Sequence, residues 1–327
     1  MPSESAASGP AQAPPQTAGD MLARAREFLA RKGAVESRLD AELLVARAVG
    51  LDRLKLFLQL DRPVSEEEVA RARELLVRRG KHEPVAYLTG TREFYGRPFR
   101  VGPGVLVPRP ETELIVDLAR ERAGTAARRP RFRATEQAAD EATPSRPALP
   151  PRVLDVGTGS GCLAITLALE LEDASIIAID LSAAALAWAR ENAAALAPDA
   201  GLEFQEGDAL RLLRDRTLRP DPALRFDLVV SNPPYVRAED AETLPPDVRE
   251  HEPGEALFAP RGDEDYWVRE LLTLAPRLLA PGGTLLVELG LGQAKRCAKL
   301  ATAAGFEPRL HEDAAGIPRV LEVNAAR

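Results

Sequence analysis

From residue 152 onward, short apolar runs alternate with longer segments of helical periodicity, and this alternation constrains the fold more than any other feature. The apolar runs read as strands, and their sequences are RVLDVG, SIIAID, LEFQEG, FDLVVS and TLLVEL, with two further short strands toward the C-terminus. Helices are expected between them at residues 160–171, 182–196, 264–279 and 292–304. Buried strands interleaved with helices predict a doubly wound α/β sheet, mostly parallel, in which ligands bind at the carboxyl ends of the strands.

The part of the chain before this sheet predicts a small all-helical domain at residues 18–90. Hydroxyl side chains stand three residues before carboxylates, as in helix capping boxes, at Thr17/Asp20, Ser37/Asp40 and Ser65/Glu68. Glycines follow as helix stops at Gly33, Gly50 and Gly80. Residues 1–17 are rich in Ala, Pro, Ser and Gln and lack the basic start and apolar block of a signal peptide, so they predict a disordered tail.

Residues 91–110 predict a β-hairpin connector, because short β-prone runs there alternate with glycine and proline. A helix is expected to open after Pro110, with Glu111 and Glu113 in its first turn. Residues 122–151 are rich in Ala, Arg and Pro and almost free of large apolar side chains, which predicts a flexible insertion. The α/β domain is therefore expected to cover residues 111–327 and to carry this insertion.

The composition argues against several classes of protein. With 43 Lys and Arg against 50 Asp and Glu, the formal net charge is −7, which is not typical of a nucleic-acid-binding protein. Two distant cysteines predict no disulfide framework and suit a reducing cytoplasm, and the three histidines lie at no metal-ligand spacing. No apolar stretch approaches the roughly 20 residues that span a bilayer. A soluble, cytoplasmic protein without a metal or membrane partner is expected, with a monomer as the default.

The segment GTGSG, residues 157–161, joins the first predicted strand to the next helix. Glycines at Gly157, Gly159 and Gly161, with Thr158 and Ser160 between them, permit a tight turn and let a ligand approach the backbone and the helix N-terminus. A dinucleotide fingerprint requires glycine at the sixth position, where this chain has cysteine, so a smaller adenosine-type ligand is favoured over NAD(P). That cysteine, Cys162, is expected to be a small buried residue without a catalytic role.

Two aspartates end the next two predicted strands. Asp180 follows Gly157 by 23 positions, and a carboxylate there can accept both hydroxyls of a ribose, although it can also cap the helix that starts at Ser182. Asp208 can meet an adenine amino group, and a plain turn or cap is nearly as good an interpretation of this residue.

The stretch SNPPYV ends the fourth predicted strand with Asn232, Pro233, Pro234 and Tyr235. Consecutive prolines stop the strand and stiffen the turn, which leaves the Asn232 side-chain oxygen and the Pro233 carbonyl as free acceptors. Two fixed acceptors can bind both N–H groups of an amide or aromatic amine and aim its nitrogen at a methyl donor, without a strong base. Tyr235 would pack its ring on the planar group.

Together these residues resemble class I S-adenosylmethionine-dependent methyltransferases. The segments VPRPETE, VLDVGTGSG, SNPPYV and DVREHEPGEALFAPRGD, over roughly residues 20–327, resemble the peptide chain release factor N(5)-glutamine methyltransferase family. The resemblance implies a Rossmann-like, mostly parallel seven-stranded sheet, S-adenosyl-L-methionine as cofactor, and a release factor as protein substrate that the helical domain helps to dock. It further implies that residues 157–161 line the methionine and ribose part of the cofactor.

The resemblance also assigns roles at the remaining strand ends. Asp180 would bind the ribose, and Asp208 with Ala209 the adenine, although Ala209 stands where a larger aromatic residue is often found. Asn232 would face the cofactor, and Asn232 through Tyr235 would hold the glutamine of a Gly-Gly-Gln loop. The insertion at 122–151 is longer than the usual connector of the family.

Two other functions compete with this interpretation. An adenine-N6 methyltransferase could use the same turn, but the flank at 237–255 carries seven carboxylates against two arginines, which disfavours a phosphate backbone there. Four arginines cluster in the insertion, at Arg128, Arg129, Arg131 and Arg133, and this segment is interpreted as a solvated linker and not as an RNA contact. A non-enzymatic binding module would require a vestigial cofactor loop, whereas the glycines and Asn232 are all present.

Overall fold

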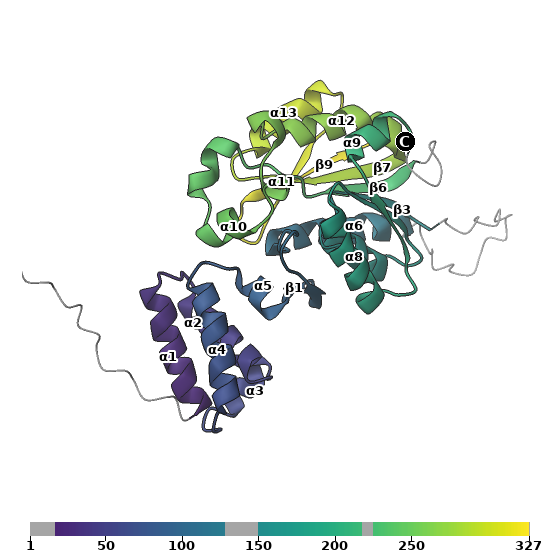
Figure 1. Cartoon of the computed structure of the whole chain (residues 1–327). Helices are drawn as coiled ribbons and strands as arrows, with labels where there is room; N and C mark the ends of the chain where they lie inside the picture. Colours follow the sequence, from purple (N-terminus) through teal and green to yellow (C-terminus); the bar gives the residue numbers. More distant parts are fainter. Residues whose placement is uncertain (1–16, 128–149, 218–224, 327) are drawn as a thin grey trace, which may run out of the picture. The chain divides into compact units, whose positions relative to one another are not determined.

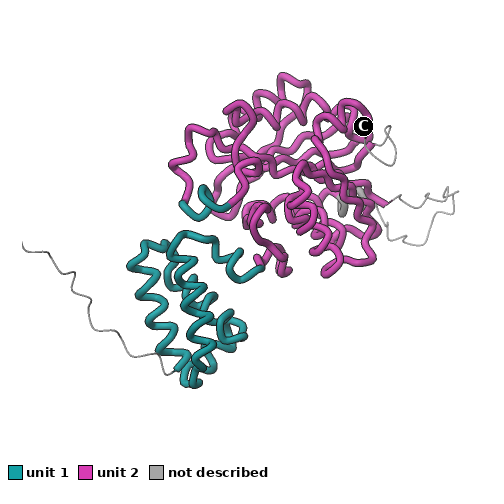
Figure 2. Tube along the Cα trace, viewed as in Figure 1, with its two compact units in different colours: residues 1–90, 246–251 teal, residues 91–245, 252–327 magenta. Residues whose placement is uncertain are grey.

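The computed structural model describes residues 17–127, 150–217 and 225–326, and the side chains of residues 123–127 are not described. The predicted tail, apart from Thr17, and most of the predicted insertion, including the cluster Arg128, Arg129, Arg131 and Arg133, lie outside these residues. The described chain forms two compact units (Figure 2). Unit 1 comprises residues 1–90 and 246–251, and unit 2 comprises residues 91–245 and 252–327.

The described part of unit 1 is built from helices and their connections, as predicted for this part of the chain. Its helices are α1 (Ala18–Arg31), α2 (Ser37–Ala48), α3 (Arg53–Leu58), α4 (Glu66–Arg79), α5 (Val85–Thr89) and α10 (Pro246–His251). Their apolar faces meet in one core, whose largest fully buried members include Leu29, Leu44 and Leu56. The prediction had placed residues 246–251 in the α/β domain, whereas their contacts assign them to the helical unit.

The predicted helix starts in unit 1 are correct in two of three cases. Capping boxes with both reciprocal hydrogen bonds are present at Thr17 of α1 and Ser65 of α4. The third prediction was wrong, because α2 already includes Ser37 and no side chain caps it. Its expected partner, Asp40, is buried and accepts a hydrogen bond from Arg79 Nε at 2.7 Å, so a tertiary ion pair replaces the local cap.

The connector is a β-hairpin, formed by β1 (Thr91–Phe94) and β2 (Arg97–Arg100) in antiparallel pairing. Tyr95 and Gly96 both have positive φ, which the two central residues of a type I′ turn require. A short 3₁₀ turn, η1 (Pro110–Thr112), then leads into α6 (Glu113–Ala127).

The predicted start of the insertion at residue 122 was wrong, because α6 continues through residue 127. Residues 122–127 read RAGTAA, and their three alanines and one arginine are good helix formers, so the lack of large apolar residues does not stop a helix that has already begun. A tertiary contact also anchors this end, since Arg122 Nη2 lies 2.6 Å from Oε2 of the buried Glu322.

The sheet of unit 2 has seven strands in the order β5-β4-β3-β6-β7-β9-β8. The predicted doubly wound, mostly parallel fold is confirmed, with helices on both sides of the sheet (Figure 1). Only β9 runs antiparallel to its neighbours. The strands are β3 (Arg152–Val156), β4 (Ser175–Asp180), β5 (Gly201–Glu206), β6 (Phe226–Ser231), β7 (Leu279–Glu288), β8 (Arg309–Glu312) and β9 (Pro318–Asn324). The chain moves outward from β3 in one direction through β4 and β5, then returns to the other side of β3 with β6. The switch point of the topology, where such sheets bind ligands, is therefore between β3 and β6.

Helices cover both faces of this sheet and bury two apolar layers (Figure 1). One layer includes side chains from α9 (Ala209–Arg214), α12 (Tyr266–Leu278) and α13 (Ala294–Ala303). The other includes side chains from α6, α7 (Cys162–Glu170), α8 (Ala183–Leu196) and the hairpin. Several elements shorter than two helical turns were not predicted, because they are too short to show periodicity: α9, η2 (Ala238–Thr243), α10, α11 (Gly254–Leu257) and η3 (Pro260–Gly262).

Candidate active site

The register of the sheet places the predicted site residues along one edge. Val156 of β3 pairs with Ile179 of β4 on one side and with Ser231 of β6 on the other, and Ser231 also pairs with Val287 of β7. The residues that follow these positions in the chain are Gly157, Asp180, Asn232 and Glu288. Four neighbouring parallel strands thus end with these residues at the same edge, on both sides of the switch point.

The glycine turn after β3 requires glycine at each of its three positions. Gly157, Gly159 and Gly161 have φ of +78°, +56° and +80°, in the left-handed region that other residues rarely adopt. A Cβ at Gly157 would meet nothing within 4 Å, whereas a Cβ at Gly161 would come within 2.8 Å of Ile165 Cδ1. The first glycine therefore leaves open space for a ligand, and the last one permits close packing against α7.

Asp155, which the sequence analysis did not single out, holds this turn in place through hydrogen bonds. Its side chain is completely buried, and Oδ2 accepts hydrogen bonds from Thr158 Oγ1 at 2.7 Å and from Ala164 N at 3.2 Å. Burial raises the pKa of Asp155 to about 7. Among the described residues, none donates to its Oδ1. The carboxyl group thus ties β3, the glycine turn and the first turn of α7 together.

Asp180 connects the glycine turn to α8. Its Oδ2 accepts from Gly159 N at 2.7 Å and its Oδ1 from Ser182 N at 2.9 Å, and burial raises its pKa. The N-cap of α8 is Ser182 and not Asp180, since the Ser182 hydroxyl accepts from Ala185 N. Each carboxylate oxygen can accept more than one hydrogen bond, so Asp180 retains capacity for hydroxyl groups of a ligand.

The next strand end carries weaker evidence for binding. Asp208 is exposed and caps α9, with its Oδ1 accepting from Arg211 N at 3.2 Å, while Ala209 is buried. Cys162 begins α7, and burial raises the pKa of its thiol to about 12. A thiol with such a pKa stays protonated at neutral pH and is a poor nucleophile.

The turn after β6 carries two oxygen acceptors at the same edge. Ser231 Oγ donates to Val156 O at 2.7 Å, which fixes the end of β6 against β3. Asn232 donates from Nδ2 to Thr112 Oγ1 at 3.0 Å. Within the part of the chain that the structure describes, no group donates a hydrogen bond to Asn232 Oδ1 or to the Pro233 carbonyl oxygen. These are the two oxygens that the sequence analysis singled out.

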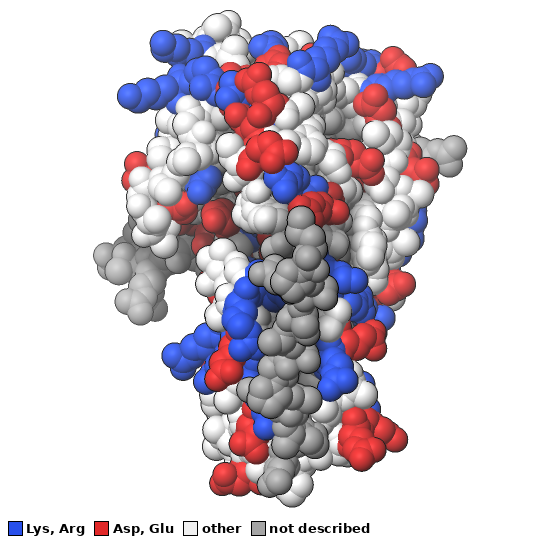
Figure 3. All heavy atoms as spheres, turned by 60° about the vertical axis from the view of Figure 1, so that its left-hand side comes forward, with Lys and Arg blue, Asp and Glu red and all other residues white. Residues whose placement is uncertain are grey.

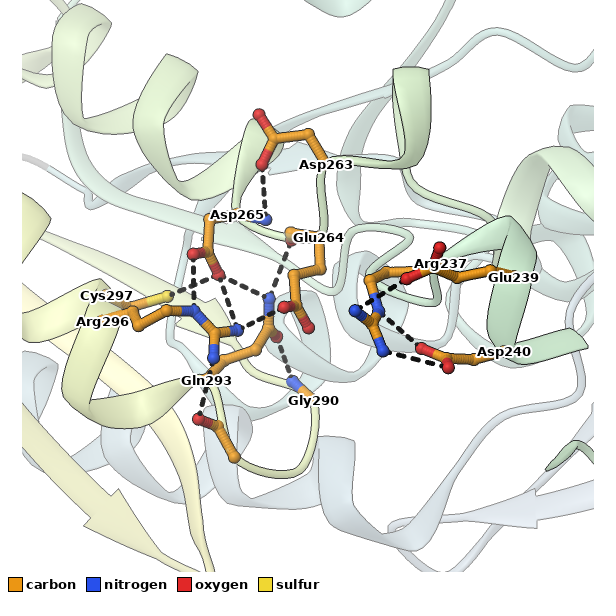
Figure 4. A network of polar contacts seen from close by, with 11 residues as sticks. Arg237, Glu239, Asp240, Asp263, Glu264, Asp265, Gly290, Gln293, Arg296 and Cys297 are labelled. Carbon is orange, nitrogen blue, oxygen red and sulfur yellow. Dashed lines mark hydrogen bonds and ion pairs between the residues drawn. The ribbon is translucent and has the colours of Figure 1, made fainter.

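The ring of Tyr235 lies on the segment that follows β7. A Cβ at Gly290 would come within 2.7 Å of Tyr235 Cδ2, so only glycine permits this approach. Gln293 holds Gly290 in place, accepting from its N–H at 2.5 Å and donating to Asp265 Oδ1 at 3.1 Å (Figure 4). Arg296 joins the same network through Asp265 (Figure 4). Burial raises the pKa of Tyr235 to about 12, which keeps its hydroxyl protonated at neutral pH.

The segment before η1 is fixed by Glu252, a buried carboxylate that precedes α11. Its Oε2 accepts from Val107 N at 3.0 Å, and its Oε1 accepts from Arg109 Nη2 at 2.6 Å. Charge-assisted hydrogen bonds of this kind are stronger than neutral ones. They hold the PRPETE segment, which carries Thr112, in a fixed position beside Asn232.

Sequence reasoning did not identify Thr112, Glu288 and Gly290 as members of the site. Glu288 could have been found, because it ends a predicted strand at the same edge as the other acids. Thr112 lies in the segment VPRPETE, in which no local pattern indicates a contact with Asn232. Gly290 offered no signal, since its importance depends on a ring 55 positions earlier in the chain.

The fold and these turns define unit 2 as a class I methyltransferase, with a glycine turn after β3 and an Asn-Pro-Pro-Tyr turn after β6. Two family models match separate parts of the chain. A model described as the PrmC N-terminal domain matches residues 20–90, and a model described as a methyltransferase domain matches residues 151–305.

Curated relatives identify the family within this class. Release factor glutamine methyltransferase from Geobacter sulfurreducens is 39% identical over 90% of this chain and 92% of its own length. The protein of the same name from Chlorobaculum tepidum is 38% identical over 94% of this chain and 96% of its own length. A solved structure of a release-factor-specific protein-(glutamine-N5) methyltransferase from Alicyclobacillus acidocaldarius matches with a TM-score of 0.39, 28% identity, and coverage of 70% of this chain and 100% of that chain. The chain belongs to the release factor glutamine methyltransferase family. None of its described helices combines the length and apolar character needed to cross a membrane.

Proposed function

We propose that the protein transfers a methyl group from S-adenosyl-L-methionine to the side-chain amide nitrogen of the glutamine in the Gly-Gly-Gln loop of a peptide chain release factor. The observation that carries this proposal is a pair of oxygens beside the glycine turn, Asn232 Oδ1 and the Pro233 carbonyl, to which no group in the described part of the chain donates. A primary amide has two N–H groups, and two fixed acceptors match them.

The residues at the strand ends suit the proposed cofactor. The open space at Gly157 gives a ligand access to the backbone, and Asp180 has acceptor capacity for ribose hydroxyls. Asp208 and Ala209, at the next strand end, would line the adenine. When bound, S-adenosylmethionine supplies an electrophilic methyl group.

The protein's own residues would act mainly by positioning. The lone pair of an amide nitrogen is delocalised, so the amide must be held with that nitrogen facing the methyl group. Asn232 Oδ1 and the Pro233 carbonyl would accept its two N–H groups, while the ring of Tyr235 would cover the amide plane. The surplus proton can leave after transfer, so no strong base is required. Positioning of this kind can supply roughly 7–11 kcal/mol of the barrier in favourable cases.

The second candidate, an adenine-N6 nucleic-acid methyltransferase, would use the same turn but also needs a surface for phosphates. The nearest arginine after the turn, Arg237, is already paired with Asp240 at 2.6 Å and Glu239 at 2.8 Å (Figure 4). On the face shown in Figure 3, acidic and basic side chains are interspersed. These observations favour a protein substrate over a polyanion.

The proposal is tested by incubating the purified protein with methyl-labelled cofactor and either a release factor or adenine-containing DNA. Label is expected in the release factor, and peptide mapping should place it on the glutamine of the Gly-Gly-Gln loop. Label found only in the DNA would refute the proposal and support the second candidate.

Replacing the proposed acceptor provides a sharper test. Asn232→Ala removes one of the two oxygens that orient the amide, and we expect kcat to fall by about 100-fold or more, as when one preorganised transition-state hydrogen bond is removed. Cofactor affinity, measured by calorimetry, should remain within a few-fold of the original. Unchanged turnover in this variant would rule out the two-acceptor arrangement.

A further inference from the structure

A buried chain of hydrogen bonds leads from the turn after β6 to the end of β7. Asn232 Nδ2 donates to Thr112 Oγ1 at 3.0 Å, and Thr112 Oγ1 donates to Glu288 Oε2 at 2.6 Å. Thr112 and Glu288 are each only 2% exposed. Three elements therefore meet here: η1 supplies the hydroxyl, β7 the carboxylate and the turn after β6 the amide.

The chemistry of the three groups fixes which of them donates and which accepts in each hydrogen bond. An ionised carboxylate can only accept hydrogen bonds, so the single hydroxyl proton of Thr112 must point to Glu288. The oxygen of Thr112 is then left as an acceptor, and the atom of Asn232 that faces it must be the NH₂ group. The other atom of the amide, Oδ1, consequently faces away from Thr112.

We propose that Thr112 and Glu288 are positioning residues that set the orientation of the Asn232 amide, so that its oxygen and not its NH₂ group is presented to the substrate nitrogen. The inference rests on the proposed function, because the oxygen is required only if the substrate offers an N–H group. With the amide reversed, two NH₂ groups would face each other, and the substrate nitrogen would lose one of its two acceptors.

The protonation state of Glu288 controls the direction of these hydrogen bonds, that is, which group donates to which. Protonated Glu288 can donate to Thr112, which frees the threonine hydroxyl to donate to the amide oxygen of a reversed Asn232. Burial raises the pKa of Glu288 to about 7, close to the working range. The charged and titratable groups that face Glu288 come from several elements: Glu111, Arg109, Arg319, Tyr235 and Cys162. The arginines favour the ionised form, whereas Glu111 disfavours it.

Substitutions at Thr112 separate hydroxyl chemistry from packing. Thr112→Val keeps the shape but removes the hydroxyl, so kcat on a release factor is expected to fall by about 10- to 100-fold. Thr112→Ser restores the hydroxyl and should recover most of the rate. Thr166→Val is the matched control, because Thr166 is also fully buried but its hydroxyl has no partner among the described residues. This control should leave kcat unchanged.

The pH profile provides a readout that simple loss of packing would not change. In the wild type, kcat should rise with pH as Glu288 ionises near pH 7. In Glu288→Gln this rising limb of the pH profile should disappear. If Glu288 acts only through Thr112, the double variant that combines Thr112→Val with Glu288→Gln should lose no more of kcat than Thr112→Val alone.

The outcomes distinguish this inference from the proposed function. A wild type that does not methylate a release factor refutes the function. An active wild type refutes the inference if Thr112→Val retains full kcat, if Thr112→Ser fails to recover it, or if Glu288→Gln keeps the same pH limb. Thermal unfolding and cofactor affinity, measured on every variant, identify loss of rate that comes from misfolding.

Discussion

At the scale of single residues, Gly290 determines where the ring of Tyr235 can lie. Its φ is not in the left-handed region, so alanine could adopt the same backbone, and the cost of Gly290→Ala is contact alone. The added Cβ would lie 2.7 Å from Tyr235 Cδ2, closer than real Cβ contacts, and the ring would have to shift. We expect kcat/KM for a release factor to fall by about tenfold or more, because misplaced substrate groups react slowly.

The control for this change is another added methyl group. In Gly254→Ala, the Cβ would meet Phe258 Cδ2 at 3.4 Å, an ordinary contact, and activity should persist. Equal activity of the two variants would show that the ring position does not limit the reaction.

Glu288 is also expected to make stability depend on pH. Burial raises its pKa from the ordinary 4.5 to about 7, so between these values the folded protein binds more protons than the unfolded chain. The stabilisation from the protonated form is complete below pH 4.5 and is lost as the pH rises through 7. The side chain in Glu288→Gln cannot ionise. The free energy of unfolding of the variant minus that of the wild type should therefore be more positive at pH 8 than at pH 5, by on the order of 3 kcal/mol.

Denaturant unfolding of both proteins at the two pH values measures this difference. The exposed Glu307→Gln serves as the reference for the loss of one carboxylate. A constant difference between wild type and Glu288→Gln across this range would show that the buried carboxyl ionises in the folded protein as easily as in water.

At the scale of elements, the strands of unit 2 were predictable because each is a short apolar run between turn signals. The boundary of β7 was not, since the strand starts at Leu279 and not at Thr284, through the sequence LAPGG. Leu279 pairs with Phe226 across an irregularity in the register, and such pairing depends on the neighbouring strand. For the same reason Asp40 became part of an ion pair and not of a cap: the competing partner, Arg79, is 39 positions away.

The edge of the sheet that forms the site was predictable for a related reason. Parallel strands in a doubly wound sheet end at one edge, so Gly157, Asp180 and Asn232 could be placed together from their positions alone. Contacts across elements could not be placed in this way. Thr112 and Asn232 are 120 positions apart, and no local pattern in η1 indicates that its hydroxyl meets the amide after β6.

At the scale of the whole molecule, the chain crosses between the two units three times. It leaves unit 1 after Gly90, returns for residues 246–251 and leaves again (Figure 2). Within unit 1, Arg79 fastens the returning segment, because its Nη1 lies 3.2 Å from Asp247 Oδ2 while its Nε binds Asp40. The guanidinium is well buried, and charged pairs in such surroundings are costly to break.

Arg79→Ala is therefore expected to release α10 from unit 1. It leaves the buried Asp40 without its cation, which should destabilise unit 1 by roughly 3–5 kcal/mol. Hydrogen exchange followed by mass spectrometry should show faster exchange in residues 246–251 and in α2, with β3, β4 and β6 unchanged. Arg73→Ala, an exposed arginine on the same helix, is the control and should leave exchange as it was. If residues 246–251 kept their protection in Arg79→Ala, contacts other than this ion pair would have to hold the segment on unit 1.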